Sequence, residues 1–141
     1  MIGAKLKQAT PTKGTILIVD DAMDMRVFIS ALFKTNGYDA IACRDGSKGL
    51  EKALEVKPDL IILDVMMPGT GGALMYKRLK LDRQLKHIPV IMLSAVGQQT
   101  FQHYLKMLNL QMMAPLPDPD AYLDKPPDAQ RLLTTAARLM T

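Results

Sequence analysis

The chain has 141 residues, of which 48% are hydrophobic and 23% charged, enough for one globular domain with a sizeable core. No apolar run approaches the roughly 18 residues of a membrane span, and the N-terminus has no apolar segment of signal-peptide length. A single cysteine excludes an internal disulfide and fits a reducing cytosol. We therefore expect a cytoplasmic protein with no membrane partner.

The net charge of +4 is unevenly distributed along the chain. Residues 1–14 contain three lysines and no acid, whereas residues 15–141 hold 15 basic and 14 acidic residues. We expect a basic tail over 1–14 and one domain over 15–141, with no room for an output domain. One basic cluster remains in the body, opposed only by Asp82 and interpreted as a solvated helix face: Lys77, Arg78, Lys80, Arg83 and Lys86. No nucleic-acid motif accompanies it, so direct nucleic-acid binding is not expected.

The first half of the domain alternates short apolar runs with segments of helical periodicity. The run ILIV from Ile16 predicts a strand that ends in Asp20-Asp21, and the apolar spacing from Ala22 to Thr35 predicts a helix. Asn36-Gly37 ends that helix, because both residues tolerate positive φ. A short strand over 38–42 and a helix over 46–56 follow. The helical positions expected to face the core are Met25, Phe28, Ile29, Leu32 and Phe33 in the first helix, and Leu50, Ala53, Leu54 and Val56 in the second.

The run DLIILDVMMPG from Asp59 to Gly69 is the central feature of the sequence. Four apolar residues lead into Asp64, which is typical of a strand buried on both faces of a parallel sheet. A helix opened by Gly71-Gly72 follows, with Met75 and Leu79 facing the core. The rest of the chain predicts a strand over 88–93, a helix from 98 to about 113, a proline-rich loop over 115–120, a strand over 121–124, and a closing helix capped by Asp128.

Five strands alternating with five helices predict a parallel sheet covered on both faces, with right-handed crossovers. Polar residues follow the apolar strands: Asp20 and Asp21 the first, Asp64 the third, Ser94 the fourth and Lys125 the fifth. In such sheets the carboxyl ends of the strands converge on one edge, and we expect Ser94 and Lys125 to lie there, open to solvent. Three carboxylates there repel one another unless a cation neutralises them, and Mg²⁺ is the natural oxygen-liganded cation. A lysine and a hydroxyl beside it suit a phosphoryl group.

The motifs VDD, LDVMMPG, LSA and DKP resemble the receiver domain of two-component response regulators, across roughly residues 15–140. The resemblance implies a doubly wound, flavodoxin-like receiver fold with strand order 2-1-3-4-5 and a phosphoacceptor at Asp64. It further implies Mg²⁺ binding by Asp21, Asp64 and the backbone carbonyl of Met66, with Asp20 contributing through water. Ser94 and Lys125 would contact the phosphate, and Tyr122 would be the rotating aromatic of the switch. Other implied features are a frequently cis Lys125-Pro126 bond and Gly72 after the phosphorylation loop.

By the same resemblance the protein would be a signalling domain that catalyses only its own aspartyl phosphorylation and dephosphorylation. Its donor would be a sensor histidine kinase or phosphotransfer protein. Its output would be a protein partner or a homodimer, engaged through the face formed by the fourth helix, the fifth strand and the fifth helix. It could act as a stand-alone regulator or a phosphorelay intermediate. A receiver-shaped interaction module that is never phosphorylated remains the alternative.

The interval from Ser94 to Lys125 is longer than usual for that family by roughly two helical turns. Its helix has just one charge from Gln98 to Pro117 and more apolar residues than one buried stripe needs. Two interpretations stay open for the surplus residues Met107, Leu110, Met112 and Met113. The segment could fold back and bury them, or they could form a partner or dimer surface.

Overall fold

A computed structural model of the chain describes residues 11–65, 67, 71–95, 99–100, 102–103, 106 and 116–141. Within them the strands are β1 (Thr15–Val19), β2 (Asp39–Cys43), β3 (Leu60–Asp64), β4 (Val90–Ser94) and β5 (Ala121–Asp124). They form one parallel sheet in the order β2-β1-β3-β4-β5, so the predicted fold class and strand order are confirmed.

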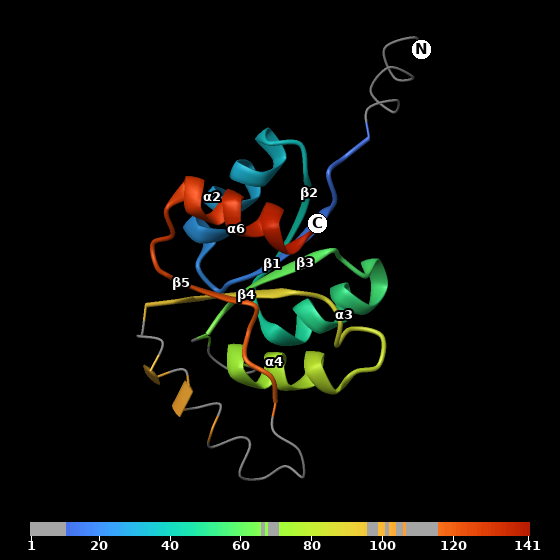
Figure 1. Cartoon of the computed structure of the whole chain (residues 1–141), viewed down its shortest axis with the longest axis vertical. Helices are drawn as coiled ribbons and strands as arrows, with labels where there is room; N and C mark the ends of the chain where they lie inside the picture. Colours follow the sequence, from blue (N-terminus) through green and yellow to red (C-terminus); the bar gives the residue numbers. More distant parts are fainter. Residues whose placement is uncertain are drawn as a thin grey trace.

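The helices lie on both faces of this sheet (Figure 1). Helices α2 (Met23–Thr35) and α6 (Ala129–Leu139) cover one face, and α3 (Gly46–Val56) and α4 (Gly72–Leu81) cover the other. The predicted helix from Gln98 to about Met113 lies mostly outside the described residues, although residues 99–100, 102–103 and 106 are helical. The surface predicted for Met107 and Leu110 lies outside them as well.

Local sequence signals explain several helix boundaries. The Asp45 carboxylate accepts the Lys48 N–H at 2.8 Å at the start of α3, and Asp128 accepts the Arg131 N–H at 2.8 Å at the start of α6. Each bond satisfies one of the free donors of a first helical turn, so the predicted cap at Asp128 is confirmed. Helix α2 ends at Thr35 with Asn36 as its C-cap, and Gly37 then adopts the positive φ of 92° that favours glycine.

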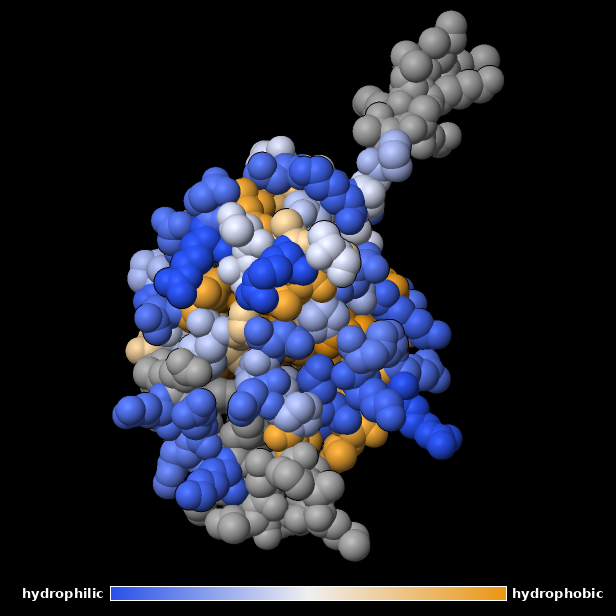
Figure 2. Space-filling view, viewed as in Figure 1, coloured by the Kyte–Doolittle hydropathy of each residue, from blue (hydrophilic) through white to orange (hydrophobic). Residues whose placement is uncertain are grey.

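Two apolar clusters, one on each face of the sheet, make up the core. Strands β3 and β4 are buried along their whole length, because helices cover both of their faces. One cluster joins α3 and α4 to the sheet and contains Met75, Tyr76 and Leu79, whereas the other joins α2 and α6 and contains Ile29, Phe33 and Leu132. The outer surface seen in Figure 2 is mostly hydrophilic. None of the helices in the described part of the chain combines the length and the hydropathy that a membrane span needs.

Two of the predicted core positions are wrong. Phe28 of α2 and Leu54 of α3 are exposed, although both fit a helical apolar pattern. In each helix the neighbouring apolar positions already fill the sheet-facing stripe: Ile29 and Phe33 in α2, and Ala53 in α3. Periodicity identifies an apolar side of a helix, but it does not limit how wide the buried part of that side is.

Candidate functional site

The polar residues at the strand ends meet at one edge of the sheet, on the left in Figure 1. Asp20 directly follows β1, Asp64 is the last residue of β3, Ser94 is the last residue of β4, and Lys125 directly follows β5. In the parallel register, Val65 N–H donates to the Leu93 carbonyl at 2.9 Å, and Lys125 N–H donates to the Ser94 carbonyl at 2.9 Å. Backbone pairing therefore continues to the edge where these side chains lie.

Three carboxylates come together there, each offering an oxygen within 4.8 Å of the other two: Asp20, Asp21 and Asp64. Asp20 and Asp64 are only 1% and 4% exposed, whereas Asp21 is exposed. Two hydrogen bonds fix the position of Asp20. Its Oδ1 accepts the Ala22 N–H at 2.9 Å, and its carbonyl accepts a hydrogen bond from Arg26 Nη1 at 2.9 Å. The Arg26 contact was not predicted, and no sequence motif marks it.

Lys125 is the cation that faces this group. Its Nζ lies 2.7 Å from Asp20 Oδ2 and 3.3 Å from Asp64 Oδ2. Burial alone would lower the pKa of Lys125. The hydrogen bond with Asp20 and the charges of Asp64 and Asp20 outweigh it, so the pKa lies above its usual value. The side chain therefore carries a full positive charge at neutral pH.

The charge of the site is not balanced by Lys125 alone. Three carboxylates and one ammonium leave two negative charges in a largely buried setting. Apart from the ion pair with Lys125, Asp20 Oδ2 has no hydrogen-bond partner among the described residues. A divalent cation with oxygen ligands would supply the missing charge, and three carboxylates on adjacent strand ends are a donor set that Mg²⁺ accepts. The residues present therefore fit the cation that the sequence predicts, while the implied ligand Met66 lies outside the described residues.

The segment after Asp64 returns to the sheet in close contact with its backbone. Gly72 N–H donates to the Val65 carbonyl at 3.1 Å, and a Cβ at Gly72 would lie 2.7 Å from both the Cα and the carbonyl oxygen of Val65. Only glycine allows α4 to begin this close to the carboxyl end of β3. The predicted special role of Gly72 thus has a steric cause.

Ser94 and Tyr122 are linked on the β4–β5 side of the site. Ser94 is buried, Tyr122 is half-buried, and their side chains form a hydrogen bond. Burial raises the pKa of Tyr122, the bond with Ser94 lowers it, and Asp124 raises it, with a net rise. The sequence led us to expect Ser94 and Lys125 at an open edge. That expectation is wrong, because Ser94 is 1% exposed and the Lys125 side chain 16%.

The path back into β5 is held to the fold by contacts that the sequence did not predict. Leu116 is buried, and the Tyr76 hydroxyl donates to the Pro117 carbonyl at 2.6 Å. The Asp120 carboxylate accepts the Val90 N–H at 2.9 Å at the start of β4. After β5 the Lys125-Pro126 peptide is cis, as the resemblance implied. These contacts fix both ends of β5 and so the positions of Tyr122 and Lys125.

Comparisons with known proteins agree with this geometry. Residues 16–137 match the family model described as the response regulator receiver domain. The chain is 31% identical over 124 residues to the polar-differentiation response regulator DivK of Brucella ovis, covering 88% of this chain and 93% of the relative. It is also 34% identical over 125 residues to the DNA-binding dual master transcriptional regulator RpaA of Synechocystis, where it covers 89% of this chain but only 48% of that protein.

Solved structures support the same assignment. The chemotaxis response regulator CheY4 of Vibrio cholerae superimposes with a TM-score of 0.76 and 28% identity, over 91% of this chain and 99% of that one. A response regulator from Chloroflexus aurantiacus gives a TM-score of 0.73 with 27% identity, over 90% and 97% of the two chains. In both cases the similarity extends over nearly the whole chain.

Proposed function

Because the chain belongs to the response regulator receiver domain family, we propose that it accepts a phosphoryl group on Asp64 and signals through the resulting change of conformation. One observation carries the proposal. Asp64 ends the buried central strand within 4.8 Å of two further carboxylates, and Lys125 contacts it directly. A nucleophilic carboxylate beside a fixed cation is the arrangement that aspartyl phosphorylation requires.

In the proposed reaction, a carboxylate oxygen of Asp64 attacks the phosphorus of a phosphohistidine on the donor. The new O–P bond forms as the P–N bond breaks, and the imidazole nitrogen keeps the electron pair and takes up a proton. Lys125, now paired with Asp20 and Asp64, would turn its charge to the phosphoryl oxygens. Asp20, Asp21 and Asp64 would hold Mg²⁺, which offsets the negative charge of the phosphoryl group when bound. Attack by water on the phosphorus would later break this O–P bond, releasing inorganic phosphate and restoring the Asp64 carboxylate.

Ser94 offers a link from the phosphoryl group to the switch. Its hydroxyl, at present bonded with Tyr122, could bond a phosphoryl oxygen on Asp64 instead. A ligand that binds one arrangement better than the other shifts the population toward it. We infer that phosphorylation changes the position of Tyr122 in this way, and with it the face around β5.

An apolar surface of this chain lies beside the site and would be the docking surface for the proposed phosphodonor, a histidine kinase or phosphotransfer protein. Met23 and Val27 of α2 are 71% and 58% exposed, and Phe28 is exposed next to them. Met23 lies two residues after Asp21, and it and Val27 line a groove of about 470 Å³ between α2 and Ala42 of β2. Exposed apolar groups of this kind mark protein interaction sites, and this one would bring a donor directly to the carboxylates.

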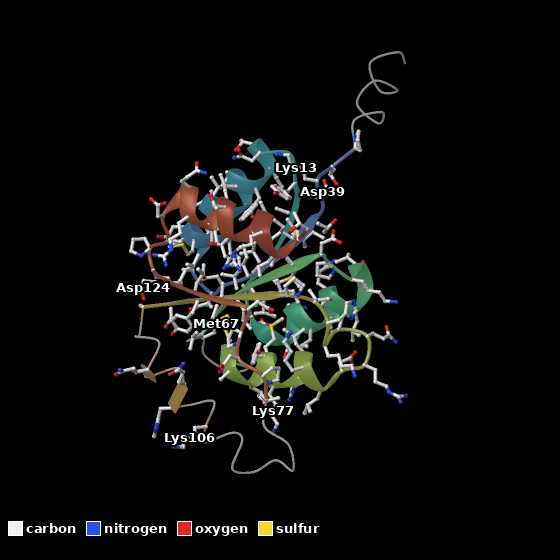
Figure 3. All side chains as sticks on the ribbon, in the orientation of Figure 1. Lys13, Asp39, Met67, Lys77, Lys106 and Asp124 are labelled. Atoms are coloured by element: carbon white, nitrogen blue, oxygen red, sulfur yellow. The ribbon has the colours of Figure 1, made fainter. Side chains whose placement is uncertain are left out.

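Intact-mass measurement after incubation with acetyl phosphate and Mg²⁺ tests the proposal. Wild-type protein should gain one phosphoryl group, and the gain should disappear in Asp64→Asn and when Mg²⁺ is chelated. Asp39→Asn is the matched control, because Asp39 is an exposed aspartate at the far end of the molecule (Figure 3). If no condition phosphorylates the wild type, or Asp64→Asn is phosphorylated equally, the alternative of an interaction module without phosphorylation is favoured.

A further inference from the structure

A cluster of cations lies at the C-terminal end of α4 and in the turn after it, away from the phosphoacceptor. Residues 77–87 contain five basic residues and one acidic residue, a net charge of +4. The rest of residues 15–141 contain ten basic and 13 acidic residues, a net charge of −3. These eleven residues therefore hold a third of the basic residues of the folded body, and their net charge is opposite in sign to that of the rest.

Two of the charged groups in this segment have a structural role. Lys80 Nζ donates to the carbonyls of Lys86 at 3.1 Å and Ile88 at 3.0 Å, which fastens the turn back onto α4. Burial lowers the pKa of Lys80, partly offset by Asp120. The Asp82 carboxylate accepts the Gln84 N–H at 2.8 Å. Lys80 and Asp82 thus build the turn itself.

Four cations remain, which we call the α4 basic cluster: Lys77, Arg78, Arg83 and Lys86. None of them forms an ion pair within the part of the chain that the structure describes. Cations at the end of a helix favour its dipole, but that effect is confined to the last turn. Arg83 and Lys86 lie beyond α4 and are exposed, so they do not serve it. Lys77 lies on the outer side of α4, away from the sheet (Figure 3).

An apolar side chain lies within this cluster. Leu81 ends α4 and is 58% exposed, four residues after Lys77, three after Arg78 and two before Arg83. Leu81 adds little to the stability of the fold, because more than half of its surface is exposed. It is suited to an interface whose centre is apolar and whose rim is negatively charged.

We propose that the α4 basic cluster and Leu81 form a docking surface for an acidic protein segment that carries an apolar side chain. Charge complementarity selects the class of partner. Nucleic acid fits less well, because Leu81 would face sugar and phosphate and no aromatic side chain is present for stacking a base. Helix α4 is about 15 Å long, and Gly72 at its other end contacts the backbone beside Asp64. A partner bound at the cluster would therefore leave the phosphoacceptor accessible.

Fluorescence anisotropy with the full chain and a labelled glutamate peptide with one central leucine tests this inference, without any phosphorylation step. Binding should weaken as salt rises above about 0.1 M. Arg78→Glu/Arg83→Glu should weaken it about tenfold or more, because two attractions become repulsions. Arg131→Glu/Arg138→Glu is the matched control. It reverses two exposed arginines of α6, on the other face of the sheet from α4, with the same change in net charge, and should have little effect.

The apolar part of the surface is tested separately. Leu81→Gln should weaken binding about threefold, whereas Leu54→Gln, at an exposed leucine on α3, should not change it. The inference fails if both double variants weaken binding equally, or if affinity does not depend on salt. It also fails if single-stranded DNA or anionic vesicles bind the cluster more tightly than the peptide with the same sensitivity to Arg78→Glu/Arg83→Glu. If circular dichroism shows that this variant is unfolded, Arg78→Gln/Arg83→Gln supplies the same comparison with a smaller expected loss of binding.

Discussion

Removing the Asp64 carboxylate should stabilise the metal-free protein, even though it removes the proposed nucleophile. Asp64 lies at most 4.8 Å from two other carboxylates. At an effective dielectric constant of about 20, each repulsion is about 3.5 kcal/mol. The ammonium of Lys125, 3.3 Å away, returns about 5 kcal/mol. Net repulsion of about 2 kcal/mol remains, and solvent around the exposed Asp21 reduces it. We therefore expect Asp64→Asn to raise the free energy of unfolding by about 1–2 kcal/mol.

Thermal unfolding with a chelator present measures this directly. For a domain of this size, the increase corresponds to a midpoint about 3–6 °C higher. Asp39→Asn should change stability by no more than about 0.5 kcal/mol, because its side chain is exposed and far from the cluster. Lys125→Met should act with the opposite sign, lowering stability by about 2–4 kcal/mol, because it leaves the buried carboxylates without their cation.

Magnesium completes the test. At ten times its dissociation constant, Mg²⁺ should stabilise the wild type by about 1.4 kcal/mol, and it should stabilise Asp64→Asn much less. The stability difference between the two proteins should therefore narrow as Mg²⁺ is added. If Asp64→Asn unfolds at or below the wild-type temperature in chelator, the three carboxylates do not repel one another as argued, and the case for a cation at this edge loses its main support.

Two further predictions concern the surroundings of the site. Gly72→Ala should cost about 2–4 kcal/mol in chemical denaturation, because the added Cβ meets the backbone of Asp64 and Val65. Gly71→Ala should cost less than about 1 kcal/mol, because among the described residues its Cβ approaches only the Met67 carbonyl, at 3.2 Å. Equal costs would contradict the steric argument. Tyr76→Phe should lose about 1 kcal/mol at pH 7 with its bond to Pro117. Burial, and then the charges of Asp120 and Asp118, raise the pKa of Tyr76 above the value it has in the unfolded chain. The protonated hydroxyl therefore stabilises the folded state fully below about pH 10, and this stabilisation is lost as the pH rises further. The wild-type advantage over Tyr76→Phe should shrink above about pH 10, and an advantage that grows there would refute this explanation.

The sheet and the convergence of its polar strand ends could be predicted because both depend on local patterns. Continuous apolar runs indicate parallel strands buried on both faces, and the carboxyl ends of such strands share one edge. The predicted strand over 121–124 and helix over 46–56 have the bounds that the structure shows. Elsewhere the bounds shift by one or two residues, as for β4, which begins at Val90 rather than at 88. Ends of elements depend on hydrogen bonds that sequence periodicity does not report.

Burial around the site could not be predicted, because residues distant in sequence create it. Ser94 is covered through packing of β4 and β5 and through Tyr122, and the Lys125 side chain is drawn in by Asp20, more than a hundred residues earlier. The contact from Tyr76 to Pro117 likewise spans 41 residues. Local sequence patterns do not report such distant contacts. They therefore predicted the correct order of Ser94 and Lys125 along the strand ends but too high a solvent exposure for both.

The destabilisation caused by the buried carboxylates indicates that the site has a functional role. Asp20 and Asp64 lie at the ends of strands that are otherwise among the best-buried parts of the protein, where neutral side chains would fit the surroundings better. Because the three carboxylates repel one another, an amide in place of the Asp64 carboxylate would make the metal-free fold more stable. Stability therefore does not explain three carboxylates at this edge. The three carboxylates oppose the rest of the fold, and the backbone N–H groups of Ala22 and Gly72 and the Arg26 side chain hold this edge in place. Such a local conflict, maintained by its surroundings, is what physical reasoning expects of a chemical site.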